Sequence, residues 1–400
     1  MKKQILITAC SLEVGGIERS LVGLLNAFDY EKYDVDVLLF SQKGEFLPLV
    51  TGGCNFLPEI PQCATLLEGI KTTLLKGHVL LALSRILSKV AMTVKYRKSE
   101  YNYDAKVFAY LQSNWDKSVH LMPKLKKQYD ACLSFMWPHH FAAFNVEAKK
   151  KIAWIHTDYT KAALDNKKDE KIWDMFHHIA AVSDECGKVF CKLYPSLSEK
   201  VVTVENILDS SFVRSQAEEF VPESMTDDCI KILTVGRMCY PKAFDRIVDI
   251  CAILKEKEIP FRWYALGYGT DEEAVKRKAE EKGVTDRMIF LGKQINPYPF
   301  MKTCDIYAQP SRYEGKAVTV REAQMLCRPV LITDFATARG QVREGFDALI
   351  VPQSEQSVAE AVERLINDKN ERDRLSENCR KSDYSNTSEV IKIYSLIGEE

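Results

Sequence analysis

The chain has 400 residues, of which 46% are hydrophobic and 28% charged, and this composition excludes a disordered or fibrous protein. Its formal net charge is −1, so the overall charge does not support a nucleic-acid-binding function, which normally brings a marked basic excess. At about 100–200 residues per domain, the length predicts two or three domains.

The first half begins with an alternation of strands and helices. An apolar strand over Gln4–Cys10 runs into a glycine-containing loop, a helix over Ile17–Phe28 follows, and the next strand covers Asp34–Phe40. This order predicts a parallel sheet of the α/β class. Further strands of the same sheet are expected at Asp130–Phe135, Lys151–His156 and Ile179–Val182.

Residues 66–128 interrupt this alternation and are strongly basic. Within them, residues 69–128 hold 12 Lys and Arg against 3 Asp and Glu, a net charge of 12 − 3 = +9. Leu74–Tyr96 is apolar with interspersed basic residues and predicts one amphipathic basic helix. We expect this helix either to lie on an anionic membrane surface or to pack on its domain with a solvated basic face.

The second half restarts the alternation. Its predicted helices cover Phe244–Lys255 and Glu272–Lys282, and the polar stretch 205–228 before them predicts a domain boundary, placed between residues 208 and 209. Two α/β domains of similar size leave a cleft between them, where ligands commonly bind. The strands predicted for the second half are Ile230–Val235, Phe261–Leu266, Met288–Leu291, Ile306–Gln309 and Val330–Thr333.

Two cations follow the first strand of the second half. The strand ends before Gly236, Arg237 and Lys242 come next, and a helix is expected to begin near Ala243. Arginine offers a planar fork and lysine a compact charge, so the two together suit a diphosphate. The alternative is a surface Arg and Lys at an ordinary helix start.

Glu314 and Glu322 lie eight positions apart in the stretch PSRYEGKAVTVREAQ. If a helix starts near Ala317, its first free N–H groups, at residues 317–319, can receive an anion between the two carboxylates. Gly315 allows close approach of the backbone, and carboxylates accept hydrogen bonds from sugar hydroxyls. Two glutamates at this spacing are also common by chance.

The first half offers a glycine pair and a histidine. Gly15 and Gly16 precede the first predicted helix and could face a ligand, although the loop is not a dinucleotide-binding fingerprint. His156 ends a predicted strand and could exchange hydrogen bonds with substrate hydroxyls. An ordinary turn and a buried structural histidine are the alternatives. His139 and His140 are interpreted as structural.

In their order and spacing these motifs resemble glycosyltransferase family 4, a family of retaining enzymes with the GT-B fold. The matching residues are Gly15-Gly16-Ile17-Glu18, His156, Gly236-Arg237 with Lys242, and Glu314-Gly315 with Glu322-Ala323. The resemblance covers nearly the whole chain and is strongest over residues 230–352. It implies two Rossmann-like domains facing each other across a cleft. The acceptor-binding domain would cover residues 1–208 and the nucleotide-sugar-binding domain residues 209–380, and a final helix in residues 381–400 would return to the first domain.

The resemblance implies a role for each matching residue. Arg237 and Lys242 would bind the diphosphate of a nucleotide sugar, Glu322 its ribose and Glu314 the hydroxyls of its sugar. His156 would lie near the transferred sugar and complete a catalytic set with Glu314, Arg237 and Lys242. Further donor-binding residues would be Gly15, Gly16, Gly236, Gly292, Gly315, Lys316, Ala317, Val318 and Thr319.

The implied reaction transfers a sugar, with retention, from a UDP-sugar to a hydroxyl of a glycan or polyprenyl-diphosphate-linked acceptor in bacterial surface-polysaccharide synthesis. No metal or cofactor is expected, because cations and a helix N-terminus would balance the charge of the diphosphate. The variant Glu314-Gly315-Lys316 resembles capsule or exopolysaccharide enzymes. Ala243 replaces a usual glycine, which is tolerable if its φ is negative. The alternatives are an isomerase of the nucleotide-sugar 2-epimerase type and a non-catalytic glycan-assembly subunit.

The twelve cysteines contain no Cys-x-x-Cys pair and mostly lie in apolar stretches. They predict reduced thiols, neither a disulfide framework nor a zinc site. The sequence contains no run of 18 apolar residues, so no transmembrane helix is predicted. The short apolar run at the N-terminus is interpreted as a strand and not as a signal peptide. We therefore expect a cytoplasmic protein, with peripheral attachment to the inner face of the plasma membrane through the basic segment as a further hypothesis.

Overall fold

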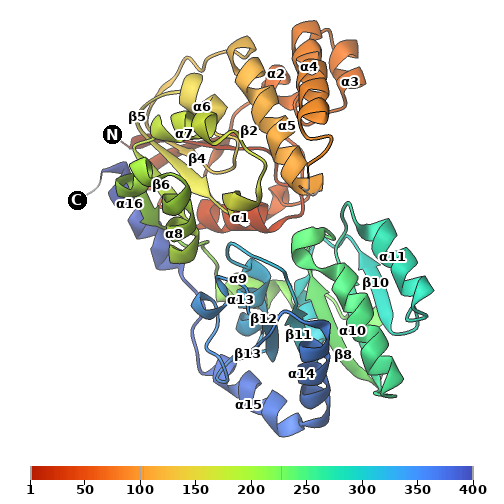
Figure 1. The fold of residues 1–400 in the computed structure, drawn as a ribbon. Helices are drawn as coiled ribbons and strands as arrows, with labels where there is room; N and C mark the ends of the chain where they lie inside the picture. Colours follow the sequence, from red (N-terminus) through yellow and green to blue (C-terminus); the bar gives the residue numbers. More distant parts are fainter. Residues whose placement is uncertain (1, 100, 102, 227, 399–400) are drawn as a thin grey trace. The chain divides into compact units, whose positions relative to one another are not determined.

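The computed structural model describes residues 2–99, 101, 103–226 and 228–398, and these form two compact units, each built on a parallel sheet (Figure 1). The first unit comprises residues 2–13, 17–206 and 388–398, and the second comprises residues 14–16 and 207–387. The predicted α/β class with two Rossmann-like units is confirmed. The expected divisions at 208 and 380 compare with observed divisions at 206 and 387.

The sheet of the first unit has the strand order β3-β2-β1-β4-β5-β6-β7. Every neighbouring pair is parallel, and Ile5 lies opposite Val35 on one side and Ala131 on the other. The two edge strands were not predicted, because two or three residues carry too little pattern. The strands are β1 (Lys3–Ala9), β2 (Tyr33–Leu39), β3 (Asn55–Phe56), β4 (Gln128–Ser134), β5 (Glu147–Ile155), β6 (His178–Ala181) and β7 (Val201–Thr203).

The helices of the first unit include one from the C-terminal end of the chain, α16. Tyr394 of this helix stacks on Tyr33 of β2, with ring centroids 4.7 Å apart, and its hydroxyl accepts a hydrogen bond from the backbone N–H of Asp29 at 2.7 Å. The helices are α1 (Gly16–Ala27), α2 (Pro61–Ala64), α3 (Ile70–Leu75), α4 (Val79–Lys95), α5 (Tyr103–Ser118), α6 (His140–Phe144), α7 (Asn166–Asp174), α8 (Asp184–Leu193) and α16 (Val390–Ile397).

The single helix predicted over Leu74–Tyr96 is wrong, because two helices share this stretch. Helix α3 ends at Leu75, and α4 begins at Val79. Gly77 lies between them with a φ of +81°, a left-handed conformation that interrupts a right-handed helix and that glycine adopts at little cost.

The sheet of the second unit has the strand order β10-β9-β8-β11-β12-β13 and separates two apolar cores. Because side chains alternate along a strand, Leu233 and Val235 enter one core and Ile232 the other. The strands predicted for this half are confirmed, and the edge strand β13 was missed. The strands are β8 (Ile230–Val235), β9 (Phe261–Leu266), β10 (Met288–Gly292), β11 (Ile306–Gln309), β12 (Val330–Thr333) and β13 (Ala348–Val351).

Helices cover both faces of this second sheet, as the two cores require. Those with side chains in the core of Leu233 are α9 (Ser210–Gln216), α12 (Tyr298–Thr303) and α13 (Val318–Met325). Those with side chains in the core of Ile232 are α10 (Phe244–Glu256), α11 (Glu272–Glu281), α14 (Glu355–Asn367) and α15 (Lys369–Arg380).

Three helices of the second unit end with a residue in the left-handed conformation. These residues are Glu258 after α10, Gly283 after α11 and Cys327 after α13, with φ between +56° and +63°. At each end, the N–H groups of this residue and of the next one bond carbonyls of the last helical turn, which is the Schellman arrangement. A Cβ disfavours this conformation, so Glu258 and Cys327 carry local strain that Gly283 avoids.

Candidate functional site

The predicted site residues of the second half lie at the carboxyl ends of its strands. Strand β8 ends directly before Gly236, β11 ends shortly before the loop that carries Glu314, and β10 ends at Gly292. Because all these strands are parallel, their carboxyl ends share one edge of the sheet. Ligands bind at this edge in open α/β sheets.

Lys242 and Glu314 form an ion pair at this edge. The Nζ atom of Lys242 lies 2.6 and 2.8 Å from the two carboxylate oxygens of Glu314, and the two side chains are only 21% and 9% exposed. The stem of Lys242 lies over Gly236, where an added Cβ would be 3.4 Å from Cδ of the lysine. The structure therefore brings together one residue expected to bind a diphosphate and one expected to bind a sugar.

A buried chain of hydrogen bonds leads from the sheet to Glu314. The hydroxyl of Tyr307 donates to Oε1 of Gln309 at 2.7 Å, and Nε2 of Gln309 donates to Oγ of Ser311 at 2.9 Å. Ser311 in turn donates to Oε1 of Glu314 at 2.6 Å. All the donors point the same way, so each bond polarises the next and holds the carboxylate in one orientation. The sequence analysis missed Gln309 and Ser311.

Arg312 clamps the loop after β11 onto the segment after β8. Its guanidinium donates to both carboxylate oxygens of Asp245, at 2.8 and 2.6 Å, and to the backbone carbonyl of Tyr240 at 2.7 Å. Burial alone would raise the pKa of Asp245, but the hydrogen bonds and charge of Arg312 lower it overall. Since Lys242 and Glu314 lie on these two segments, the clamp keeps them within reach of each other. The sequence analysis missed the pair of Asp245 and Arg312. Its only signal in the sequence is one acidic and one basic residue, each within one of the two motifs.

Ala243 has a φ of +58°, so the condition under which it could replace a glycine without strain is not met. The residue is fully buried and serves as the N-cap of α10, directly after Lys242. A Cβ in the left-handed region costs about 1–2 kcal/mol. Lys242 is therefore followed by a strained position, and a glycine there would carry no such strain.

A further glycine, Gly267, is required where β8 and β9 end. Its φ is +143°, and an added Cβ would lie 1.9 Å from the carbonyl oxygen of Gly236. The N–H of Gly236 donates to the carbonyl of Leu266 at 3.0 Å, so the ends of the two strands stay paired at this point. Only a residue without a side chain fits such a close approach.

Free backbone N–H groups at residues 317–319 were predicted to receive an anion, and the N-terminus of α13 has two of them available. Ala317 is the N-cap, but its N–H already donates to Oε1 of Gln341 at 3.0 Å. Val318 and Thr319 follow in the first turn, and among the described residues no protein acceptor is recorded for their N–H groups. These N–H groups, and not that of Ala317, are the ones left to receive an anion.

Glu322 is 2% exposed and lies within α13, where the hydroxyl of Tyr298 donates to its Oε1 at 2.6 Å.

Tyr307 lies near both Glu314 and Glu322. Its pKa is raised well above the usual value, first by burial and then by the negative charges of Glu322 and Glu314. Tyr307 therefore stays protonated and can act as the first donor of the chain that reaches Glu314.

The other predicted residues of this unit differ in how open their surroundings are. Arg237 is exposed, and within the described part of the chain its side chain has no recorded hydrogen bond or ion pair. Gly292 has a φ of +65°, and an added Cβ would meet open space. Gly315 is buried and Lys316 half-buried in the loop between Glu314 and α13. A diphosphate could thus reach Arg237 without displacing a partner.

His156 of the first unit follows the end of β5, and Gly15 and Gly16, which are grouped with the second unit, lie at the start of α1. Nε2 of His156 is 2.8 Å from the carbonyl oxygen of Phe135, which can only accept, so this nitrogen carries the proton. Burial lowers the pKa of His156 to about 4, and its Nδ1 is therefore a neutral acceptor at pH 7. Gly16 begins α1 at an exposed position with open space where a Cβ would lie, and Gly15 directly precedes it.

His139 and His140 are buried and structural, as predicted. Nδ1 of His139 lies 2.8 Å from Oγ of Ser134, and Nε2 of His140 lies 3.0 Å from a carboxylate oxygen of Asp116. Burial lowers the pKa of His139 well below its ordinary value, so it stays neutral.

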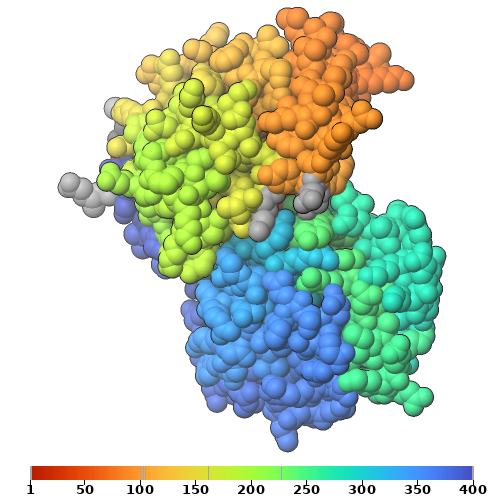
Figure 2. All heavy atoms as spheres, in the orientation of Figure 1, coloured from red at the N-terminus to blue at the C-terminus, as the bar shows by residue number. Residues whose placement is uncertain are grey.

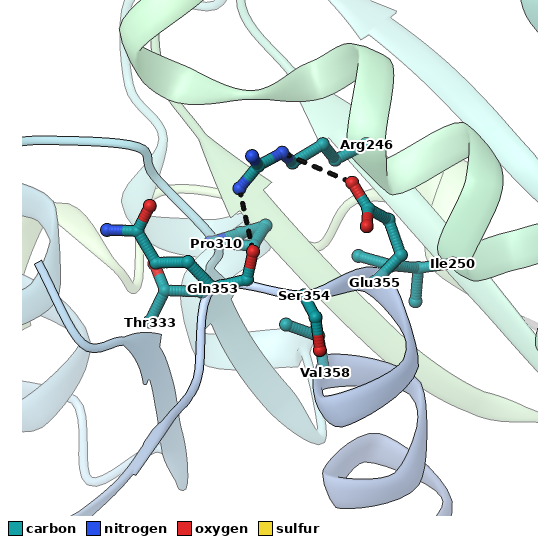
Figure 3. Close-up of a pocket in the computed structure, with 8 residues that line it drawn as sticks. All are labelled: Arg246, Ile250, Pro310, Thr333, Gln353, Ser354, Glu355 and Val358. Atoms are coloured by element: carbon teal, nitrogen blue, oxygen red, sulfur yellow. Dashed lines mark hydrogen bonds and ion pairs between the residues drawn. The ribbon is translucent and has the colours of Figure 1, made fainter.

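A crevice between α10 and the loop before α14 is a packing feature and not a ligand site. Figure 3 shows Arg246 beside it, ion-paired to Glu355 at 3.2 Å and donating to the carbonyl of Gln353 at 3.1 Å. It has no room for a water molecule. These contacts attach α14 to α10 behind the loop that carries Glu314.

Three further findings concern the described residues. Their twelve cysteines are all free thiols. No three His, Cys, Asp or Glu side chains among them come together in a group that could hold a metal ion. None of their helices is long and apolar enough to cross a membrane.

Comparisons with known proteins find similarity to glycosyltransferases. Residues 215–382, which make up most of the second unit, match the family model described as "Glycosyl transferases group 1". The chain is 26% identical over 156 residues to alpha-D-kanosaminyltransferase of Streptomyces kanamyceticus, covering 38% of this chain and 40% of that protein. It is 25% identical over 151 residues to the lipopolysaccharide core biosynthesis glycosyltransferase LpsE of Rhizobium meliloti, covering 38% and 43%. These matches span less than half the length of either relative.

The fold is also that of solved structures. The crystal structure of Anabaena HepE in complex with UDP and glucose superposes with a TM-score of 0.70 at 13% identity, over 100% of both chains. At this identity the likeness concerns the fold alone, which is of the GT-B type.

Proposed function

We propose that this protein is a glycosyltransferase that moves a sugar from a nucleotide-diphosphate donor, a UDP-sugar, to a hydroxyl of a glycan or polyprenyl-diphosphate-linked acceptor. The observation that carries the proposal is the pairing of Lys242 with Glu314 at the carboxyl edge of the second sheet. Both residues lie inside the segment that matches the glycosyltransferase family model.

The charge of the donor diphosphate would be balanced by protein groups. Lys242, Arg237 and the N–H groups of Val318 and Thr319 lie in the segments that follow β8 and β11. In the transition state, negative charge grows on the departing diphosphate, and fixed donors stabilise it most where water is excluded. These groups make a metal unnecessary in the proposed reaction.

The sugar and ribose would be held by the two glutamates. Glu314 has both carboxylate oxygens at Lys242 but retains further lone pairs for sugar hydroxyls. When the nucleotide sugar binds, Nζ of Lys242 would share its hydrogen bonds between Glu314 and a phosphate oxygen. Glu322, oriented by Tyr298, would accept from a ribose hydroxyl.

The transfer would retain the anomeric configuration by attack on the face from which the diphosphate leaves. The acceptor oxygen forms the new bond to the anomeric carbon as the bond to the diphosphate oxygen breaks, and the proton of the acceptor passes to a phosphate oxygen. The sugar carries oxocarbenium character midway. His156, whose Nδ1 can only accept, would receive a hydrogen bond from a sugar hydroxyl and would not supply positive charge.

The named relatives support the proposed biological setting. One acts in lipopolysaccharide core biosynthesis and the structural neighbour holds UDP and glucose, which supports a UDP-sugar and bacterial surface-polysaccharide synthesis of the capsule or exopolysaccharide kind. The twelve free thiols, six of them buried, support a cytoplasmic location.

The testing experiment compares thermal stability with UDP, GDP, ADP or CDP in the presence of EDTA. A ligand at 100 times its dissociation constant adds about 2.7 kcal/mol. We expect UDP to raise the Tm of the wild type and of Lys257→Ala, a matched control whose lysine pairs with Glu363 on the surface. Lys242→Ala should lose the shift. Equal shifts in Lys242→Ala would contradict the assigned diphosphate site, and a shift that needs a divalent metal would contradict metal independence.

Turnover then separates the alternatives. A transferase releases UDP from a UDP-sugar when an acceptor glycan is present, and Lys242→Ala should lower kcat/KM by about 100-fold or more. An epimerase would convert the UDP-sugar without an acceptor. A non-catalytic subunit would do neither, although it could still bind UDP.

A further inference from the structure

Helix α4 exposes a wide apolar outer side and buries polar side chains on its inner side, unlike an ordinary surface helix, whose exposed side is polar. Its buried residues are Leu81, Ala82, Ser84, Arg85 and Ser88. Hydrophobic side chains line the opposite, outer side, and they are 40–71% exposed. They recur every three or four positions, which places them on one face: Val79, Leu80, Leu83, Ile86, Leu87, Val90 and Val94.

The orientation of α4 is fixed by hydrogen bonds on its inner side. Ser84 and Ser118 of α5 share a hydrogen bond of 2.6 Å, and Ser88 accepts from Lys117 of α5 at 3.1 Å. Arg85 donates to Oγ1 of Thr73 at 3.0 Å and to the carbonyl of Thr65. A buried arginine requires such hydrogen-bond partners. Rotating the helix to expose its inner side would separate Arg85 from them. The apolar side therefore faces outward.

The exposed apolar face continues onto α3. Leu74 and Leu75 are 44% and 79% exposed. Figures 1 and 2 show α3 and α4, in orange, at the outer edge of the first unit, and α5 lies between α4 and the rest of the unit in Figure 1. We call these nine exposed side chains the α3–α4 face. Exposed apolar side chains in such number mark a site that binds a membrane or another protein.

Positive charge borders the α3–α4 face. Lys71, Lys89, Lys95, Arg97 and Lys98 are exposed, and the acidic Glu68 is already paired with Lys76 at 2.6 Å. The surrounding stretch 69–128 has a net charge of +9. A second copy of the chain docked symmetrically on this face would bring two such positive borders together, which costs free energy. An anionic surface complements them instead.

We propose that the α3–α4 face lies in the interface of a lipid bilayer that carries anionic headgroups, with α4 parallel to the surface. The aliphatic side chains enter the boundary between headgroups and acyl chains, and the lysines extend to the phosphates. Helix α4 packs on its own domain, but its outer face is aliphatic and not basic, which favours the membrane alternative over a solvated basic face. The inference concerns attachment alone and does not rest on the proposed reaction.

The test measures flotation of the full chain with vesicles of phosphatidylcholine containing 30 mol% phosphatidylglycerol, and with vesicles of phosphatidylcholine alone. We expect binding to the anionic vesicles and at least tenfold weaker binding to the neutral ones. Leu83→Gln/Leu87→Gln should lower the partition coefficient at least tenfold. Lys71→Gln/Lys89→Gln should lower it about 30-fold, since each lysine near an anionic surface contributes about 1 kcal/mol.

The matched control, Val221→Gln/Ile391→Gln, makes the same chemical change at side chains 79% and 60% exposed elsewhere, and should bind like the wild type. Unchanged circular dichroism and Tm show that the variants fold. Absence of wild-type flotation, or equal flotation of Leu83→Gln/Leu87→Gln, would overturn the proposal. So would a dimer in light scattering that the same variant converts to a monomer while no variant binds vesicles, because the face would then join two copies.

Discussion

Replacing Ser311 by alanine removes the last donor of the buried chain that orients Glu314. A hydrogen bond to a charged group contributes about 1.5–3 kcal/mol, so kcat/KM for sugar transfer should fall about 10- to 150-fold if the bond is fully used in the transition state. Gln309 would lose its buried acceptor, which should lower the free energy of unfolding by about 1–3 kcal/mol. The loss in kcat should exceed any change in UDP affinity, because Ser311 acts on the sugar-binding carboxylate.

A matched control separates positioning from stability. Thr333 is equally buried, and its hydroxyl donates to the backbone carbonyl of Ser311 at 2.6 Å. Thr333→Val should cost similar stability while kcat/KM changes less than threefold. Tyr307→Phe removes the first donor of the chain, and in a double-mutant cycle with Ser311→Ala the two losses should not add. Wild-type kcat/KM in a folded Ser311→Ala variant, or strict additivity in the cycle, would refute the reasoning.

Two further predictions concern stability. Glu258→Gly should raise the free energy of unfolding by about 0.5–1 kcal/mol, because relief of about 1–2 kcal/mol of left-handed strain exceeds the added unfolded-state entropy, and Gly283→Ala should lower it, both measured by urea denaturation. A decrease for Glu258→Gly would contradict the assigned strain. Acidification should also destabilise the fold: since the folded pKa of His156 is about 4 against an ordinary 6.5, the unfolded chain binds the extra proton, and about 3 kcal/mol present above pH 6.5 is lost as the pH falls to about 4. His156→Gln should reduce the slope of unfolding free energy against pH by up to one proton, and an unchanged slope would contradict the assigned pKa.

The strands of the second unit were predictable from sequence because buried parallel strands are continuous apolar runs between turn residues. Ile230–Val235, Phe261–Leu266 and Ile306–Gln309 have the predicted bounds. The helix beginning after Ala317 was predictable for a similar reason, since glycine and polar residues precede it. The individual motifs of the site were therefore visible in the sequence.

The partners within the site were not predictable. Lys242 and Glu314 lie 72 positions apart, and only the tertiary register decides that they meet. The positive φ at Ala243 has no local sequence signal, because alanine, unlike glycine, does not indicate a left-handed residue. For α4, the periodicity predicts two unlike faces but not which one faces inward. The serine and arginine partners on α5 and α3 decide that, and they come from other segments.

The packing of Tyr394 on Tyr33 has a practical consequence for dividing the protein. The second unit is, apart from residues 14–16, one continuous stretch set into the first, so no single cut yields two intact halves. A fragment ending at residue 206 would lack α16 and leave the ring of Tyr33 uncovered. A split protein should instead be made as residues 207–387 on one side, and as residues 1–206 joined by a short linker to the C-terminal segment on the other.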